Sequence, residues 1–447
     1  MLGLKPGNFQ KTPQKISKNT LFIRFIKEKM ASLSRNRLFF LVFLLILSRT
    51  FVISTINSVP DTEPIYVNLA QQLFESSNKI DTCLSPGYPV LLYVMNLMFN
   101  NWKLSSQIIY IVFSIGIALI SYVIAKTLFS KETALYSLLI FIFLPNLTSA
   151  VAGYSHIVVV SMFFLYLAVY FFLLILKNQK IIDFIAFSSF MLFATLIRSE
   201  NVVYLIMFLL IYVGIVIYQI LKRSRVFPIS FLIITFTIFL GGLWLQYYFI
   251  KSRSSTNYWT LLGNARYSYK TYLHTLSLRS EGTIMDSSQI SSWGIKAFGT
   301  PEDNQFSIIK AIMKNPAEAI KNIAFNIKSL LKDLGHPLFI PVFLYPFLGI
   351  GIFSTSLRSK WKDHLFLISL LIPTLLTISL FHEEIRYMSP LVPPFVIWIA
   401  LGISKLRSAI KKPVVIALVF FLATLFIVYT FHMRISQHTK NTVLVNS

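Results

Sequence analysis

Residues 156–176 read HIVVVSMFFLYLAVYFFLLIL, a run with no aspartate, glutamate, lysine or arginine. An α-helix needs about 20 apolar residues to cross the hydrocarbon core of a bilayer, because each residue advances the helix by about 1.5 Å. Runs of comparable character recur along the chain at 38–56, 104–126, 132–152, 181–198, 201–221, 228–250, 338–357, 364–381, 389–404 and 413–431. The sequence therefore predicts an all-α polytopic membrane protein with about eleven transmembrane helices.

The composition of the chain supports a lipid bilayer as its surroundings. Of the 447 residues, 55% are hydrophobic and 13% are charged, whereas soluble proteins carry about 25% charged residues. The net charge of +24 can indicate nucleic-acid binding, but the cations gather near the ends of the apolar runs. An excess of lysine and arginine in cytoplasmic loops explains this placement better, and no nucleic-acid partner is expected.

The charges of the loops predict the orientation of the chain in the membrane. If the basic N-terminus is cytoplasmic, the short loops on the same side carry most of the lysine and arginine. The opposite loop 145–155 carries none, and 382–388 has one arginine beside two glutamates. Two loops on this outer side are long, 57–103 and 251–337. The frequent use of lysine, isoleucine and asparagine suits an AT-rich bacterial genome, so we expect the protein in a bacterial plasma membrane.

We divide the chain into a basic cytoplasmic segment (1–37), a membrane domain (38–431) and a C-terminal tail (432–447). Within the first segment, residues 21–34 predict an amphipathic helix on the membrane surface. In the second long loop, residues 316–334 predict a helix with Pro316 in its first turn, lying on the outer face of the membrane. The apolar residues that we expect on one face of this helix are Ile320, Ile323, Ile327, Leu330, Leu331 and Leu334.

The first long loop holds the strongest candidates for chemistry. Asp61 and Glu63 follow Pro60 directly after the first apolar run, where a short helix is predicted to begin. Two carboxylates at this place can act as a general base for a hydroxyl, or as ligands of a hard divalent cation. Capping of the short helix is the structural alternative, because aspartate is a common N-cap residue.

Two motifs in this loop resemble those of known enzymes. The pattern D-x-E-x-x-Y-x-x-L-A spans Asp61 to Ala70, and SPGYPVLLY follows at 85–93. Together they resemble the first outer loop of GT-C glycosyltransferases. The match is closest to the dolichyl-phosphate-mannose–protein mannosyltransferase-like superfamily, which includes bacterial lipid A aminoarabinose transferases. Many members have adjacent acidic residues, whereas a threonine separates Asp61 from Glu63 here.

Two later segments extend the resemblance along the chain. LFATLIRSENVV, residues 192–203, resembles the Leu-x-Arg step that ends a middle helix in this superfamily, with Ser199 where a proline is common. FHEEIRYMSPLVPPFVIWIALGIS, residues 381–404, resembles the Arg-Tyr-x-x-Pro segment that begins a late helix. The order of these segments also fits the superfamily.

The resemblance implies transfer of a sugar, with inversion, from a polyprenyl-phosphate donor to a lipid, glycan or protein acceptor outside the cytoplasm. Asp61 is then the expected base, and Glu63 assists it or binds a divalent metal; no nucleotide or redox cofactor is required. Arginine suits the binding of the donor phosphate. The expected substrate-binding residues are Arg386, Arg198, Arg49, Tyr66, Tyr88, His382 and Tyr387.

The arginines also have structural alternatives. Arg386 can pair with Glu383 or Glu384, and Arg198 can pair with Glu200. Arg49 lies inside the first apolar run, where a charge costs about 2.5–3.5 kcal/mol on insertion scales. It therefore either faces the interior of the helix bundle with a partner or extends to the membrane surface.

Other functions account for parts of the sequence. A transporter or flippase of a lipid-linked saccharide also needs buried charges, although no inverted repeat is evident. A polysaccharide polymerase or ligase would use arginines of the second long loop, such as Arg253, Arg266 and Arg279. A non-catalytic subunit of a membrane complex is a third alternative. The run His382-Glu383-Glu384 lacks the second histidine of a zinc protease motif.

Overall fold

The computed structural model describes most of the predicted membrane domain. The described residues are 18–55, 63–75, 85–144, 156–222, 229–253, 259–260, 263–264, 269, 272–273, 292–336, 339–353, 360–381, 387–406 and six single positions between 417 and 428. Side chains are not described for 18–35, 55, 63, 253, 259–260, 263–264 and 292–293. The chain divides into two units, residues 1–44 and 45–447.

Within the described ranges, seven helices are long and apolar enough to span a membrane. They are α1 (Lys18–Thr55), α4 (Trp102–Leu128), α7 (His156–Asn178), α9 (Val202–Leu221) with the preceding turn η2 (Ser199–Asn201), α10 (Ser230–Arg253), α17 (Trp361–Leu380) and α18 (Val392–Leu406) with the preceding turn η4 (Ser389–Leu391). The shorter apolar helices are α3 (Gly87–Phe99), α8 (Ile181–Ile197) and α15 (Tyr345–Phe353), the last after the turn η3 (Val342–Leu344). The short helix α5 (Lys131–Phe143) packs on α4 and α18. The chain is therefore a polytopic helical membrane protein.

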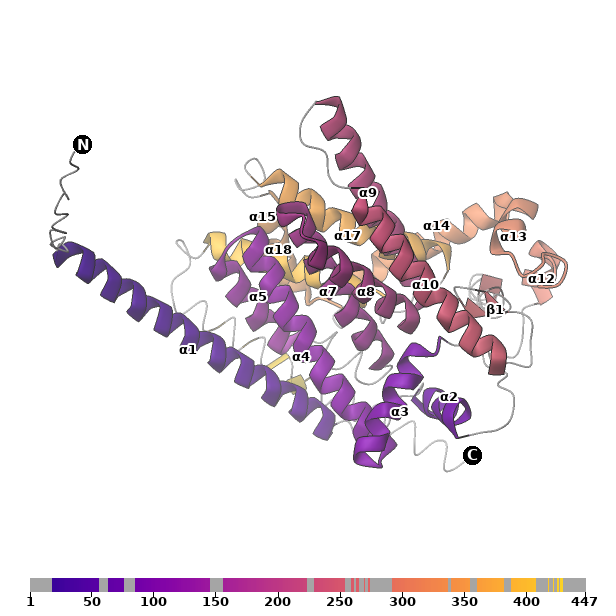
Figure 1. Cartoon of the computed structure of the whole chain (residues 1–447), viewed down its shortest axis with the longest axis horizontal. Coiled ribbons are helices and arrows are strands. Elements are labelled where there is room, and N and C mark those ends of the chain that lie inside the picture. The colour runs from indigo at the N-terminus through magenta and orange to yellow at the C-terminus, as the bar shows by residue number, and fades with distance from the viewer. Residues whose placement is uncertain are drawn as a thin grey trace, which may run out of the picture. The chain divides into compact units, whose positions relative to one another are not determined.

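Ten of the eleven predicted apolar runs correspond to these helices, and the run 413–431 lies mostly outside the described residues. The helix predicted at 21–34 is present, but it is continuous with the first span because α1 runs unbroken from Lys18 to Thr55. The apolar helix α3 was not predicted as a separate element, since Gly87–Phe99 is too short to span. It packs against α4 and α8 (Figure 1).

Helices α15 and α18 cross with their backbones in contact. A Cβ atom at Gly351 would lie 1.9 Å from the carbonyl oxygen of Trp398, and one at Gly402 would lie 2.0 Å from that of Phe347. Both distances are far below van der Waals contact. Glycines at such crossings let membrane helices approach closely, so dispersion and backbone contacts replace the hydrophobic force that lipid does not supply.

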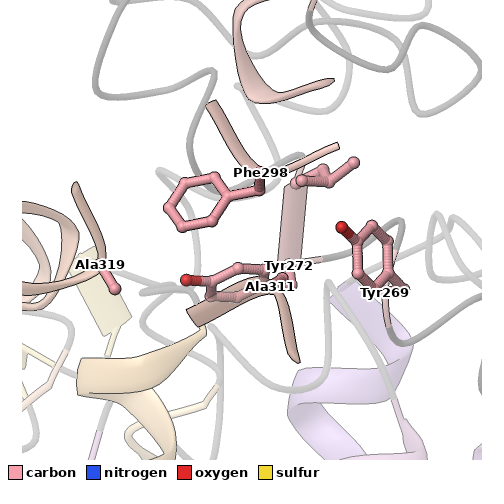
Figure 2. Packing of buried hydrophobic residues seen from close by; sticks show 6 residues of the cluster. Tyr269, Tyr272, Phe298, Ala311 and Ala319 are labelled. Atoms are coloured by element: carbon pink, nitrogen blue, oxygen red, sulfur yellow. The ribbon is translucent and has the colours of Figure 1, made fainter. Parts of the chain in front are cut away.

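Helices outside the spans form two groups. Helix α2 (Glu63–Phe74) packs on α3, whereas α12 (Ser292–Phe298), α13 (Ile308–Lys314) and α14 (Pro316–Leu334) contact one another in order and α14 packs on α17. The strands β1 (Trp259–Thr260) and β2 (Gly263–Asn264) form one short antiparallel ladder. Tyr272, Phe298 and Ala319 belong to a buried cluster against which Phe381 packs. Figure 2 shows the rings of Phe298 and Tyr272 directed toward the helix that carries Ala319.

Helix α14 has the bounds that the sequence predicts, with Pro316 as its first residue after the N-cap Asn315. The predicted apolar face, however, is not the face that packs on the protein. Ile320, Ile327 and Leu331 are exposed, whereas the residues buried in the protein are Ala319, Asn322, Asn326 and Leu330. Of the predicted face, Leu330 alone is buried, because α14 meets α17 with its smaller and more polar side.

Candidate functional site

The two tyrosines of the first-loop motifs lie against each other. Tyr66 on α2 and Tyr88 on α3 form an edge-to-face pair with ring centroids 5.2 Å apart. The Leu-Ala pair of the motif, Leu69 and Ala70, is buried in the same helix, which packs on α3. The small side chain of Ala70 allows this close packing, and Tyr88 is fully buried. The spacing of these residues therefore positions α2 against the start of α3.

The start of α3 also contacts the end of α8. A Cβ atom at Gly87 would lie 2.6 Å from the carbonyl oxygen of Leu196 and 2.9 Å from the backbone nitrogen of Ile197. Only a glycine permits this approach without displacing the backbone. The Pro-Gly-Tyr step thus rests on the last turn of α8, directly before Arg198.

Arg198 joins the middle motif to the late motif. Its Nε donates a hydrogen bond of 2.6 Å to Oε1 of Glu200, and the two side chains form an ion pair. The guanidinium carbon also lies 4.9 Å from the centroid of the Tyr387 ring, in a cation–π arrangement. The pair with Glu200, which the sequence offered as the structural alternative, is therefore present.

Hydrogen bonds tie the late motif to α7, and the turn η2 to α7 and α8. The hydroxyl of Tyr166 donates to the carbonyl oxygen of Pro390 over 2.6 Å. Asn201 donates from Nδ2 to Oγ of Ser161 over 2.7 Å and to the carbonyl oxygen of Ala194 over 2.8 Å. These contacts bring segments distant in sequence to one end of the bundle, which we call the site end: the start of α3, the end of α8 and the turn before α18.

Arg49 lies in the interior, which rules out extension of its side chain to the membrane surface. Its exposed fraction is 0%, and Nη2 donates to the carbonyl oxygen of Phe141 over 2.7 Å. That carbonyl lies in the last turn of α5, where residue 145 is a proline and has no N–H to offer. The guanidinium thus occupies the negative end of the α5 dipole.

Other nitrogens of the Arg49 guanidinium are not hydrogen-bonded within the described residues. Nε and Nη1 have no hydrogen-bond partner among the described residues. The ion pairs formed within the described part of the chain do not include Arg49. A buried cation of this kind favours an anionic ligand, because three of its five N–H groups lack an acceptor.

Sequence reasoning missed a buried polar group at the starts of α4 and α7. Oγ of Ser106 and Nδ1 of His156 are 2.6 Å apart, and the ring of Tyr110 lies 5.1 Å from that of His156. All three residues are buried. The pair could not be found from local pattern, because 50 residues separate serine from histidine. It links the start of α4 to the start of α7.

Thr300 and Asp303 form two reciprocal hydrogen bonds in the turn before α13. The backbone N–H of Thr300 donates to Oδ2 of Asp303 over 2.9 Å, and Asp303 N–H donates to the Thr300 hydroxyl over 3.1 Å. The N–H donor lowers the pKa of Asp303 by stabilising the carboxylate.

Burial raises the pKa of Tyr269, whose hydroxyl accepts a hydrogen bond from Asn304.

Four of the predicted site residues cannot be placed. Asp61, His382 and Arg386 lie outside the described residues, and Glu63 begins α2 but its side chain is not described. The base and metal-ligand roles of Asp61 and Glu63 therefore stay predictions. Within the described ranges, no three His, Cys, Asp or Glu side chains are grouped as a metal site requires.

No protein-family model matches the chain, and no curated protein matches its sequence. Solved structures do match its fold. ArnT from Cupriavidus metallidurans bound to undecaprenyl phosphate is 13% identical with a TM-score of 0.50, over 82% of this chain and 60% of that chain. The archaeal oligosaccharyltransferase AglB from Archaeoglobus fulgidus, in complex with an inhibitory peptide and a dolichol-phosphate, is 12% identical with a TM-score of 0.51.

The AglB match covers 89% of this chain and 56% of that one. A second Archaeoglobus fulgidus oligosaccharyltransferase structure, with Zn and sulfate, is 13% identical with a TM-score of 0.52, over 88% and 52% of the two chains. This chain thus spans about half to three fifths of the length of these proteins. The matches define its class by fold: it has the fold of the GT-C glycosyltransferases, to which ArnT and AglB belong.

Proposed function

We propose that this protein is a membrane glycosyltransferase that moves a sugar from a polyprenyl-phosphate donor to an acceptor on the extracytoplasmic face. The observation that carries the proposal is the meeting of the motif segments at the site end. Gly87 rests on the end of α8, and Arg198 from that end stacks on Tyr387. Three segments that are distant in sequence thus meet in one part of a GT-C fold.

The proposed reaction is a single displacement. The carboxylate of Asp61 removes the proton of the acceptor hydroxyl while the acceptor oxygen attacks the anomeric carbon of the donor. The bond from that carbon to the phosphate oxygen breaks, and its electron pair leaves on the lipid phosphate. The products are an inverted glycoside, a polyprenyl phosphate and a protonated Asp61. Glu63 assists the base or binds a divalent metal.

The arginines take separate roles in this proposal. Arg198 already has an anionic partner, so it positions Tyr387 and the adjacent Arg386, which would hold the phosphate. Arg49 is buried and has nitrogens without acceptors, which supports it as a second cation for the phosphate. Tyr66 would contact the substrate, whereas the buried Tyr88 would support the ring of Tyr66 through their edge-to-face contact.

A release assay tests the proposal. The purified protein, in nanodiscs, is given a panel of polyprenyl-phosphate sugars with acceptors, and free polyprenyl phosphate is measured. We expect release with at least one donor, and its loss in Asp61→Asn while the donor still binds. A flippase would move the lipid across a vesicle membrane without release. A folded protein that releases no lipid phosphate from any donor would refute the proposed function.

A further inference from the structure

Helix α14, which packs on α17, buries two asparagines one turn apart. Asn322 and Asn326 are 1% and 3% exposed, and they lie on the face that also buries Ala319 and Leu330. Amides are uncommon in such a position, because a buried polar group must be hydrogen-bonded to avoid a loss of free energy. The two asparagines meet this requirement differently.

Asn326 has its partners. Its Nδ2 donates to the carbonyl oxygen of Ser379 over 3.1 Å and to that of Phe381 over 3.3 Å. Helix α17 ends at Leu380, so these carbonyls belong to the terminal group that receives no helical N–H. The amide of Asn326 thus caps α17 from a neighbouring helix, and its burial has a structural explanation.

Asn322 has no such partners. Both Oδ1 and Nδ2 are buried and lack a hydrogen-bond partner among the described residues. One turn away, Ala319 is packed in the apolar cluster with Tyr272 and Phe298 (Figure 2). A leucine would suit these surroundings, whereas the amide leaves two donors and an acceptor unpaired. The described part of the chain thus does not account for an amide at this position.

We propose that the Asn322 carboxamide binds a neutral hydroxyl of the saccharide substrate, an inference that rests on the proposed function. The place fits, because α17 leads directly into the segment that carries Arg386 and Tyr387. The chemistry fits as well. A neutral amide can donate to and accept from a sugar hydroxyl, whereas the lipid phosphate needs the cations at Arg49 and Arg386.

The burial of Asn322 in the ligand-free chain is compatible with this role. An unpaired amide weakens the packing of this face of α14, so the contact that the face makes separates at a lower cost in free energy than a fully paired one. A hydroxyl that enters the contact supplies the missing hydrogen bonds. Asn322 is therefore a specificity residue that becomes satisfied when the saccharide is bound.

Substitution of Asn322 by leucine tests the inference. Leucine keeps the branching at Cγ and removes the donors and the acceptor. We measure the affinity of the protein in nanodiscs for a polyprenyl-phosphate sugar and for bare polyprenyl phosphate, and the KM for the acceptor. We expect the preference for the sugar-bearing lipid, or the acceptor affinity, to fall about tenfold, as for one lost hydrogen bond. The two measurements distinguish the donor sugar from the acceptor.

Matched variants separate this role from stability. Asn322→Leu should unfold at the same temperature as the wild type or higher. Asn322→Ala, whose side chain is smaller, should lose the same preference and shows that the loss does not come from a steric effect of leucine. Asn326→Leu should unfold at a lower temperature and keep the preference. A folded Asn322 variant with unchanged preference and unchanged acceptor KM would overturn the inference, while wild-type turnover would leave the proposed function intact.

Discussion

Replacement of Arg49 by methionine should affect donor binding far more than folding. The substitution removes a charge whose burial costs about 2.5–3.5 kcal/mol in the middle of a span. It also removes a hydrogen bond from a charged donor to the Phe141 carbonyl oxygen, 2.7 Å away, worth about 1.5–3 kcal/mol. These effects oppose each other, so we expect the free energy of unfolding to change by less than about 2 kcal/mol.

Donor binding has no such compensation. If Nε or Nη1 of Arg49 donates to the lipid phosphate, loss of that charged hydrogen bond weakens binding by about 10- to 100-fold. Thermal unfolding measures the first quantity, and equilibrium binding of bare polyprenyl phosphate measures the second. Arg49→Lys keeps the charge and should recover part of the affinity. Unchanged affinity in Arg49→Met, or destabilisation above about 4 kcal/mol, would refute the reasoning.

Three further predictions concern packing, the ion pair and pH. Gly351→Ala should destabilise the protein by at least about 1–3 kcal/mol in thermal unfolding, because its Cβ would overlap α18; Gly349→Ala is the control, with nothing within 4 Å. Glu200→Gln should change the free energy of unfolding by less than about 1 kcal/mol but lower kcat/KM, since Arg198 loses its anchor; unchanged kcat/KM would contradict this. The pKa of Asp303 is lowered in the folded chain, so its contribution to stability is present at neutral pH and is lost as pH falls through that pKa; proteolysis of the turn should increase on acidification, and less so in Asp303→Asn.

The sequence predicted those features that depend on local composition. The spans followed from apolar runs. The start of α14 followed from Pro316, because a helix tolerates proline in its first turn but not in its interior. The direction in which α14 packs did not follow. A stripe of isoleucine and leucine looks the same whether it faces protein or lipid, and Ile320 and Leu331 turn out to be exposed.

Features that depend on distant contacts could be predicted only in part. The interior position of Arg49 was one of two expectations, but its partner is a backbone carbonyl, and side-chain patterns carry no signal for that. Pro145 was the available clue, because a proline four residues after Phe141 leaves that carbonyl without a helical N–H. The Ser106–His156 contact and the α15–α18 crossing need the three-dimensional structure, since each joins residues about 50 apart.

The geometry at Arg198 bears on how charge is distributed in the proposed site. A guanidinium that is already paired with Glu200 has lost much of its capacity to attract a second anion, because the carboxylate cancels its charge at short range. Its guanidinium also stacks on Tyr387, two residues before the turn η4. The phosphate must then be neutralised by cations that lack a carboxylate partner. Among the described residues Arg49 meets this condition in the interior. Its removal should therefore weaken donor binding more than the removal of Arg198.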